Sequence, residues 1–229
     1  MEKQDLFVSM DAKLKDGQWY DINLPPKFDW KFLDSTLASG RMDHLYYLFH
    51  YASILPDESR ILEIGTGLSD STRAMGMAIR GTNSIITTID PIMLSIEETK
   101  MRKEELSKYE FNLGYNRIHE VLNRIKNMNL DGYITPIADT SENVLKRWDG
   151  RKIDMLFVDG SHQYEDVKID CQWMQYIKPG GIAVFDDWIE AVEKAVTEYV
   201  SDKPEWEMLT VSTVQPPGKP WKTVYWRNW

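Results

Sequence analysis

The feature that most constrains the fold is a regular alternation, from residue 60 onward, of short apolar runs with longer helix-like segments. The runs are rich in β-branched residues and continuously apolar, as strands covered on both faces of a parallel sheet must be. The segments between them are long enough for crossover helices. The predicted strands are Ile61–Ile64, Ser84–Ile89, Tyr133–Ala138, Ile153–Val158 and Ile182–Phe185.

Helix and turn signals extend this prediction to the end of the chain. The stretch Tyr164–Lys178 has apolar residues at helical spacing and is followed by the helix-stopping sequence PGG, and Ile189–Val200 also reads as a helix. The strand-like runs Leu209–Val214 and Trp221–Arg227 are joined by the turn sequence QPPGKP. We therefore predict an α/β, doubly wound, Rossmann-like sheet of seven strands, mostly parallel with a C-terminal antiparallel hairpin, and helices on both faces.

Two regions depart from the alternation. Residues 1–58 carry turn signals and scattered aromatics before an amphipathic helix around Met42–Leu55, and we interpret them as a helical and irregular cap. Residues 59–229 form the predicted domain, interrupted by an insertion at 91–130 that is longer than a simple crossover needs. The insertion has two interpretations, a lid or interface element and a solvated helical pair.

Charge and cysteine content exclude several classes of protein. The chain of 229 residues has 27 Lys and Arg against 36 Asp and Glu, so its formal net charge is −9, which argues against binding to a nucleic-acid backbone. A single cysteine, Cys171, rules out an internal disulfide framework. No apolar run approaches the roughly 18 residues that span a bilayer. We expect a cytoplasmic protein without a membrane or nucleic-acid partner.

The sequence ILEIGTGLSDST at Ile61–Thr72 carries the first candidate site. Its glycines allow a tight turn between a strand and a helix whose first N–H groups face a ligand. Asp90 ends the next predicted strand, where a carboxylate can accept both ribose hydroxyls of a nucleoside. An ordinary strand–helix turn is the alternative interpretation.

The same segment favours an adenosyl ligand without phosphates. A dinucleotide site needs a third glycine where this chain has Asp70, and a carboxylate at a helix N-terminus would repel a pyrophosphate. Glu63 adds another carboxylate, which suits the sulfonium and ammonium groups of S-adenosylmethionine. An NAD(P)-dependent oxidoreductase is the alternative enzyme class.

Acidic residues also end two later strands. Asp159 and His162 follow one strand in IDMLFVDGSH, and Asp186 and Asp187 follow the next in IKPGGIAVFDDW. Ligands gather at the carboxyl ends of strands in open α/β sheets, so these groups are expected to converge with Asp90. Carboxylates and a histidine make a hard-cation site, most naturally for Mg²⁺. Polar strand ends without a ligand, and a capping role for His162, are the alternatives.

The order of these motifs resembles that of the class I S-adenosylmethionine-dependent methyltransferases. EIGTG, IDP, IADT, VDGSH and KPGG with FDDW occur in that order over about residues 60–188. Within the class the chain is similar to the metal-dependent O-methyltransferases, which include the catechol and caffeoyl-CoA types. The stretch Val158–Asp170 is closest to the macrolide-sugar and cephalosporin-hydroxylase-like branch.

The resemblance implies roles for individual residues. It places the methionine end of the cofactor on the glycine-rich turn, its ribose on Asp90 and its adenine amino group near Asp139. The cofactor-binding residues that it implies are Glu63, Gly65, Thr66, Gly67, Ser71, Asp90, Asp139 and Asp159.

The resemblance also implies a metal-assisted reaction. Asp159 and Asp187 match metal-ligand positions, and His162 matches the base that deprotonates the acceptor, so Asp159 and His162 are the expected catalytic residues. Trp188 stands where the catechol type has an amide ligand, so either Asp186 or water completes the metal shell, or the metal is absent.

We therefore expect methyl transfer to a hydroxyl of a small molecule, such as a sugar, a polyol or a catechol. A methyltransferase-fold binding protein without turnover is a second alternative. The oligomeric state is open, with a homodimer as one option.

Overall fold

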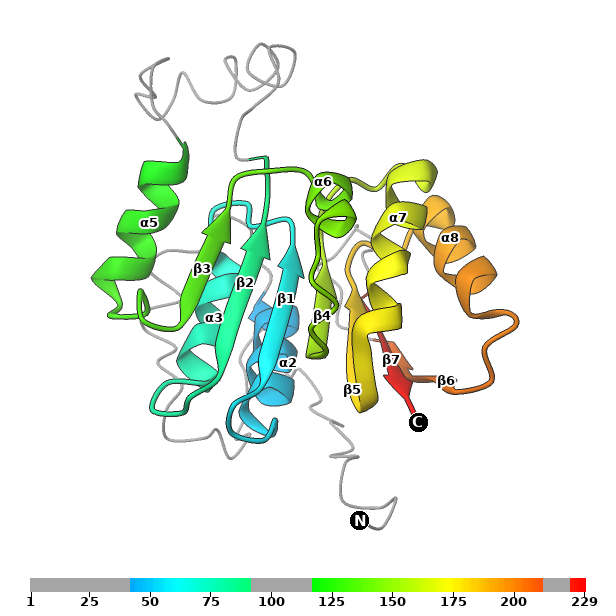
Figure 1. The fold of residues 1–229 in the computed structure, drawn as a ribbon, viewed down its shortest axis with the longest axis horizontal. Coiled ribbons are helices and arrows are strands. Elements are labelled where there is room, and N and C mark those ends of the chain that lie inside the picture. The colour runs from blue at the N-terminus through cyan, green and yellow to red at the C-terminus, as the bar shows by residue number, and fades with distance from the viewer. Residues whose placement is uncertain (1–41, 92–116, 212–222) are drawn as a thin grey trace, which may run out of the picture.

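The computed structural model describes residues 42–91, 117–211 and 223–229 (Figure 1). It contains a seven-stranded sheet in the order β3-β2-β1-β4-β5-β7-β6. The strands are β1 Arg60–Ile64, β2 Ile85–Ile89, β3 Ile134–Ile137, β4 Ile153–Val158, β5 Ile177–Phe185, β6 Trp206–Val211 and β7 Val224–Asn228. The helices are α2 Met42–Ser53, α3 Asp70–Ala78, α5 Arg117–Asn127, α6 Ser141–Lys146, α7 Tyr164–Cys171 and α8 Glu190–Val200, with a 3-10 helix at Gln172–Tyr176.

The strand pairing confirms the predicted architecture. β3, β2, β1, β4 and β5 pair in parallel, whereas β7 pairs antiparallel with both β5 and β6. Along the chain, β2 and β3 are added on one side of β1, and β4 is then added on its other side. The strand order therefore reverses between β1 and β4, which is where doubly wound sheets bind ligands.

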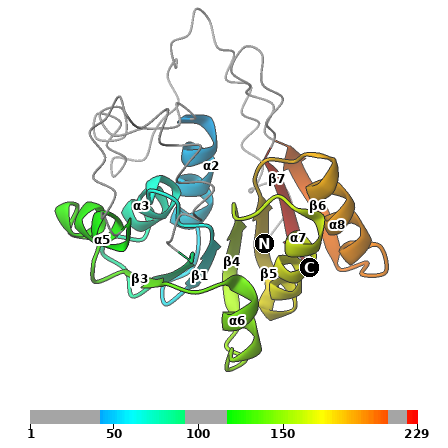
Figure 2. The same cartoon turned by 90° about the horizontal axis from the view of Figure 1, so that it is seen from above.

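Helices cover the two faces of the sheet, as Figure 2 shows. One buried cluster joins α2, α3 and α5 to one face, and a second joins α6, α7 and α8 to the other. The strands at the centre of the sheet are consequently covered on both sides, and all six residues of β4 are buried. This two-sided burial is the physical reason for the continuous apolar runs in the sequence.

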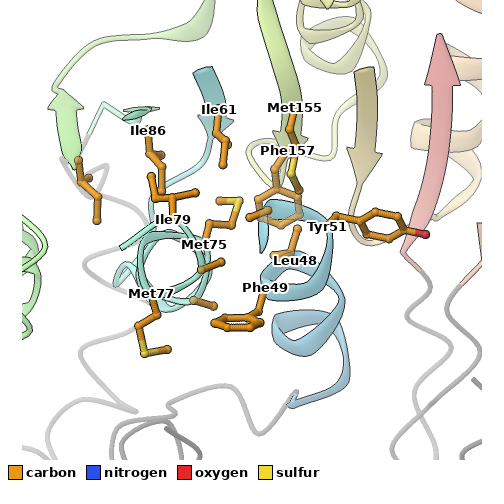
Figure 3. Packing of buried hydrophobic residues seen from close by; sticks show 14 of the residues in the cluster. Leu48, Phe49, Tyr51, Ile61, Met75, Met77, Ile79, Ile86, Met155 and Phe157 are labelled. Atoms are coloured by element: carbon orange, nitrogen blue, oxygen red, sulfur yellow. The ribbon is translucent and has the colours of Figure 1, made fainter. Parts of the chain in front are cut away.

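The packing of α2 on α3 anchors the first face (Figure 3). Leu45, Leu48, Phe49 and Ala52 of α2 are almost completely buried at the spacing of one helical face. Met75 of α3 lies in the same cluster. The amphipathic helix predicted around residues 42–55 is thus confirmed, and it supports the helix that follows the glycine-rich turn.

The prediction that PGG ends a long helix is wrong. Helix α7 ends at Cys171, and the chain passes through the 3-10 helix into β5, so PGG lies inside that strand. The register between β4 and β5 shifts there. A Cβ on Gly181 would lie 2.5 Å from Ile177 Cγ2 and 2.8 Å from the Asp154 carbonyl oxygen, so this bulge requires glycine.

Much of the predicted cap and insertion lies outside the described residues, as does the QPPGKP turn. The described parts are residues 42–58 of the cap, with helix α2, and from the insertion Pro91, helix α5 and the residues that follow it. Within the described ranges, no helix combines the length and apolar character needed to cross a bilayer.

Asp170 gives the fold a pH dependence that can be measured. It is 3% exposed on α7, and burial raises its pKa to about 7, although a hydrogen bond with Ser141 opposes the shift. The folded protein therefore holds this proton more tightly than the unfolded chain, so the contribution of Asp170 to stability falls as the pH rises from about 4 to about 7.

We predict that Asp170→Asn hardly changes the free energy of unfolding near pH 4 and raises it by about 1–3 kcal/mol near pH 8, because the amide cannot ionise. Urea unfolding at both pH values measures the effect. The matched control is Glu165→Gln on the exposed side of α7. An equal change at both pH values for Asp170→Asn would contradict the prediction.

Candidate functional site

Backbone hydrogen bonds align the residues that follow four parallel strands. Each residue donates its N–H to a carbonyl of the neighbouring strand, so the ladder continues one step past the strand ends. The donors Asp90, Gly65, Asp159 and Asp186 bond to the carbonyls of Ile137, Ile89, Ile64 and Val158, at 3.1, 2.8, 2.8 and 2.9 Å respectively. The predicted site residues are thus brought to one edge of the sheet.

Gly65 makes the closest approach at this edge. It has a φ of +92°, and a Cβ there would lie 2.0 Å from the Asp159 carbonyl oxygen. Gly67 also has a positive φ, and its N–H donates to Asp90 Oδ2 at 2.9 Å. The turn is therefore possible because Gly65 has no side chain. A hydrogen bond to Asp90, the carboxylate predicted to meet the ribose, holds it in place. This glycine cradle at the switch point fits an adenosyl cofactor.

Three predicted cofactor residues lie beneath the turn. Glu63 is fully buried, and its two oxygens accept hydrogen bonds from Ser71 Oγ at 2.6 Å and Thr72 Oγ1 at 2.5 Å. Thr66 is also buried, and its hydroxyl bonds to that of Thr88 at 2.6 Å. The side chains of Glu63, Thr66 and Ser71 consequently tie β1, β2 and α3 together and do not line an open surface.

An arginine neutralises the carboxylate at the start of α3. Arg73 is 1% exposed, donates to the Ser69 carbonyl at 3.1 Å and forms an ion pair with Asp70. Arg124 of α5 lies 3.8 Å from the same carboxylate. Ser69, the residue before α3, has a left-handed backbone that this contact supports. The expected repulsion between Asp70 and a phosphate is therefore weaker than the sequence suggested.

Asp159, His162 and Asp187 form a compact cluster beside the turn. One ligand atom from each lies within 4.8 Å of the others. His162 Nε2 is 3.8 Å from Asp159 Oδ1 and 3.4 Å from Asp187 Oδ2, and neither contact has hydrogen-bond geometry. The three side chains are 25–32% exposed, so the cluster is open to a ligand on one side.

The electrostatics of the cluster are those of carboxylates held close together. Burial raises the pKa of Asp159 well above its usual range, and the charges of Asp186 and Asp187 raise it further, while His162 opposes the shift. The pKa of His162 is raised first by its contact with Asp159, against the effect of burial. The cluster therefore favours gaining positive charge, as a proton or as a cation.

Asp187 reaches the cluster through an unusual backbone. Its φ is +45°, and its carbonyl accepts the N–H of Ile189 at 2.6 Å, which closes a tight turn after β5. A non-glycine residue with positive φ is uncommon and often found at functional sites. Because of this turn, the side chains of the adjacent residues Asp186 and Asp187 lie in different environments.

The structure does not support Asp186 as a third metal ligand. Asp186 is 3% exposed and accepts a hydrogen bond from Thr223 at the start of β7. The side chain that lies with Asp159 and Asp187 in the cluster is that of His162. Trp188, which replaces the amide ligand of the catechol type, packs near Trp226 with ring centroids 6.5 Å apart.

Asp139, predicted near the adenine, is engaged with its own helix. Its Oδ1 accepts hydrogen bonds from Thr140 N and Asn143 Nδ2, at 2.8 and 2.9 Å, and its Oδ2 lies 2.6 Å from Arg147. These contacts hold the pKa of Asp139 below its usual range. The carboxylate therefore orders the start of α6, and its partly exposed side chain stands at the same edge of the sheet.

Comparison with known proteins decides the family. A family model described as a methyltransferase domain matches residues 62–188, more than half of the chain. The chain belongs to the class I S-adenosylmethionine-dependent methyltransferases. An uncharacterized protein of Acanthamoeba polyphaga mimivirus is 32% identical over 174 residues, which are 71% of this chain and 70% of the relative.

Solved methyltransferase structures share the fold at low identity. The O-methyltransferase TomG of Streptomyces achromogenes has a TM-score of 0.59 at 16% identity, over 81% of this chain and 79% of that one. An rRNA methylase of Streptococcus thermophilus has a TM-score of 0.58 at 13% identity, over 80% and 95%. TrmN of Thermus thermophilus has a TM-score of 0.58 at 11% identity, over 81% and 48%, so this methyltransferase spans about half of that chain.

The sequence reasoning missed three supporting residues of the site. Arg73 donates to the Ser69 carbonyl before α3, and Thr88 bonds to Thr66 beneath the turn. Thr223 donates a hydrogen bond to Asp186. Thr88 had a signal, because a polar residue inside a buried strand needs a partner. Arg73 had one too, because it stands three residues after Asp70 at the start of a helix, the spacing of a helical ion pair. Thr223 had none, since long-range strand pairing brings it to Asp186.

We predict that Gly65→Ala abolishes binding of S-adenosylhomocysteine or destabilises the methyltransferase by about 3 kcal/mol or more, because the new Cβ collides with the Asp159 backbone. Gly150→Ala is the matched control: Gly150 also has a positive φ, of +82°, but no atom lies within 4 Å of its Cβ position. Thermal unfolding and calorimetric titration measure both. Equal losses in the two variants would assign the effect to backbone conformation alone.

Proposed function

We propose that this methyltransferase transfers the methyl group to a hydroxyl of a small molecule with the help of a divalent cation. The observation that carries the proposal is the cluster of Asp159, His162 and Asp187 beside the glycine-rich turn. A hydroxyl held at this cluster stands next to the cofactor cradle, so the reacting groups meet at one edge of the sheet.

The donor set fits a hard divalent cation. Asp159 and Asp187 supply carboxylate oxygens, which Mg²⁺ and similar ions prefer. His162 Nε2 is a buried polar atom without a hydrogen-bond partner, and it faces both carboxylates. A buried polar atom left without a partner costs free energy, which an acceptor hydroxyl donating a hydrogen bond to this nitrogen would offset.

We assign the two carboxylates to the cation and His162 to the acceptor proton. Asp159 is held by its backbone bond to β1, and Asp187 by its left-handed turn. Both carboxylates stabilise the imidazolium that forms when His162 Nε2 takes the proton. The chain thus supplies two carboxylates at fixed positions and an imidazole that accepts the proton.

The chemistry of the transfer is a direct displacement. When bound, S-adenosylmethionine supplies the methyl group: its carbon–sulfur bond breaks as the carbon–oxygen bond forms, and the sulfur keeps the electron pair. A divalent cation, when bound, lowers the pKa of a coordinated hydroxyl. The residues of the site fix the in-line geometry and accept the hydroxyl proton.

Charge favours a small acceptor over RNA. The net charge of −9 and the carboxylates at the sheet edge give the site no attraction for a phosphate backbone. Structural similarity to rRNA methylases extends to the fold at 13% identity and carries no information about the acceptor. A neutral hydroxyl compound such as a sugar, a polyol or a catechol suits this environment.

We predict that Asp187→Asn weakens the binding of Mn²⁺, used as a paramagnetic probe, by at least about tenfold, because a carboxylate ligand is lost. Electron paramagnetic resonance titration measures the affinity. The control is Asp166→Asn, which removes an exposed carboxylate that accepts a hydrogen bond from Ser161 outside the cluster. Wild-type protein that binds no Mn²⁺ would overturn the metal assignment.

We also predict that His162→Ala lowers the rate of methyl transfer by about 100-fold or more, because the proton acceptor is lost. Mn²⁺ affinity should change little, and added imidazole should restore part of the rate. A large loss of Mn²⁺ affinity in this variant would instead make His162 a ligand. Single-turnover assays over a panel of sugars, polyols and catechols provide the rate.

A further inference from the structure

His162, the proposed proton acceptor, lies in the loop between β4 and α7, and hydrogen bonds hold this loop on both sides of it. On one side, the Asp159 N–H donates to the Ile64 carbonyl at 2.8 Å. On the other, the Ser161 hydroxyl oxygen accepts the N–H of Gln163 at 3.3 Å, which closes a turn with His162 in its middle. The backbone of His162 is therefore enclosed by a bond between its two neighbours.

The Ser161 hydroxyl is in turn anchored to helix α7. It donates to Asp166 Oδ2 at 2.5 Å, and Asp166 lies in the first turn of that helix. Because the hydroxyl donates one hydrogen bond and accepts another, its orientation is fixed. We call Ser161 and Asp166 the loop clasp. It ties the residue before the imidazole to a rigid element.

The loop clasp differs from an ordinary helix cap. Gln163 stands directly before α7, and its side chain makes no capping bond. An acid at the third helical position ordinarily bonds back to the N–H of the capping residue. Asp166 occupies that position, but it accepts its bond from Ser161, whose oxygen receives the Gln163 N–H instead. The carboxylate thus reaches past the helix start to the loop that carries His162.

The loop clasp is not needed to hold the helix on the sheet. Ser161 and Asp166 are both exposed, and exposed hydrogen bonds contribute little to folding because water can replace them. Helix α7 is instead anchored by Val167 and Cys171, which are buried in the second core cluster. The effect of the clasp therefore falls on the loop that it closes.

The imidazole of His162 has no hydrogen bond of its own at Nε2 to fix its position. This atom is 3.8 Å from Asp159 Oδ1 and 3.4 Å from Asp187 Oδ2, and it is without a hydrogen-bond partner. A proton acceptor must nevertheless lie within hydrogen-bond reach of the reacting hydroxyl. A displacement of about 1 Å can lower a rate by about 100-fold. The position of the ring thus depends on the backbone that carries it.

We propose that Ser161 and Asp166 are positioning residues that hold the His162 imidazole at the two carboxylates of the cluster for proton transfer. This inference rests on the proposed function, because it takes His162 as the proton acceptor. The charges that act on His162 are those of the cluster carboxylates and of Asp186. Asp166 acts through its bond to Ser161, so an uncharged group that accepts the same bond should replace it.

The first test is single-turnover methyl transfer to whichever sugar, polyol or catechol the wild type methylates. We expect Ser161→Ala to lower the rate about tenfold and Asp166→Ala to lower it about threefold or more. Ser161→Thr and Asp166→Asn keep the hydrogen bond and should stay near the wild-type rate. The affinities for S-adenosylhomocysteine and Mn²⁺ should not change, since Asp159 and Asp187 are held by contacts of their own.

A double-mutant cycle separates positioning from general damage. In a His162→Ala background, Ser161→Ala should lower the rate no further, because the clasp acts only through the imidazole. The matched controls are Glu165→Ala, which removes an exposed acid beside Asp166, and Ser201→Ala, which removes a hydroxyl bonded to the Glu198 carbonyl at the end of α8. Both should keep the wild-type rate.

A readout without an acceptor is the order parameter of the His162 ring from ¹³C relaxation, with the signal assigned by its loss in His162→Ala. We expect the order parameter to fall in Ser161→Ala, toward the flexible range below about 0.6, and to stay at the wild-type value in Ser161→Thr. If Ser161→Ala does not fold, Asp166→Ala is measured in the same way.

Two results would overturn the inference. One is an unchanged rate and ring order in Ser161→Ala, and the other is an equal loss of rate from Ser161→Ala with and without His162. A wild-type rate in His162→Ala, or no methylation of any compound in the panel, would instead refute the proposed function. The ring order would then still decide whether the loop clasp holds the imidazole.

Discussion

The contact between Gly65 and the backbone of Asp159 is the constraint on which the site depends. It brings the first residue after β1 against the first residue after β4, where the strand order reverses. The neighbouring N–H groups continue the sheet ladder on both sides of this contact. As a result, the glycine-rich turn, the Asp90 carboxylate and the acidic cluster share one edge of the sheet.

Near this edge, the acidic side chains fall into three groups according to their contacts. Asp70 is paired with Arg73, and Asp139 with Arg147, so these carboxylates organise helix starts. Asp186 is buried against Thr223. Asp159 and Asp187 lie with His162 in the partly exposed cluster, and Glu63 is buried below the turn against the hydroxyls of Ser71 and Thr72. The acidic side chains near the sheet edge are therefore divided between buried structural contacts and the partly exposed cluster.

Several features of the fold and site follow from local pattern. The parallel strands were predicted within a few residues because burial on both faces requires continuous apolar runs, and helix α2 because its apolar residues share one face. The positions of Gly65 and Gly67 were clear because only glycine suits such a turn. The extent of α7 was wrong because its apolar spacing continues into a 3-10 helix and the bulged start of β5.

The sequence by itself determined the order of the elements, the glycine-rich turn and the acidic residues at strand ends, because each is a property of a few neighbouring residues. Only the tertiary structure decided which carboxylates lie together in one cluster. Asp186 and Asp187 are adjacent and chemically identical, yet Asp187 lies in the cluster with His162 and Asp186 bonds to Thr223. Glu63 reads as a cofactor contact, yet it is sealed beneath the turn. Side-chain partners across distant strands set these roles, and local sequence does not encode them.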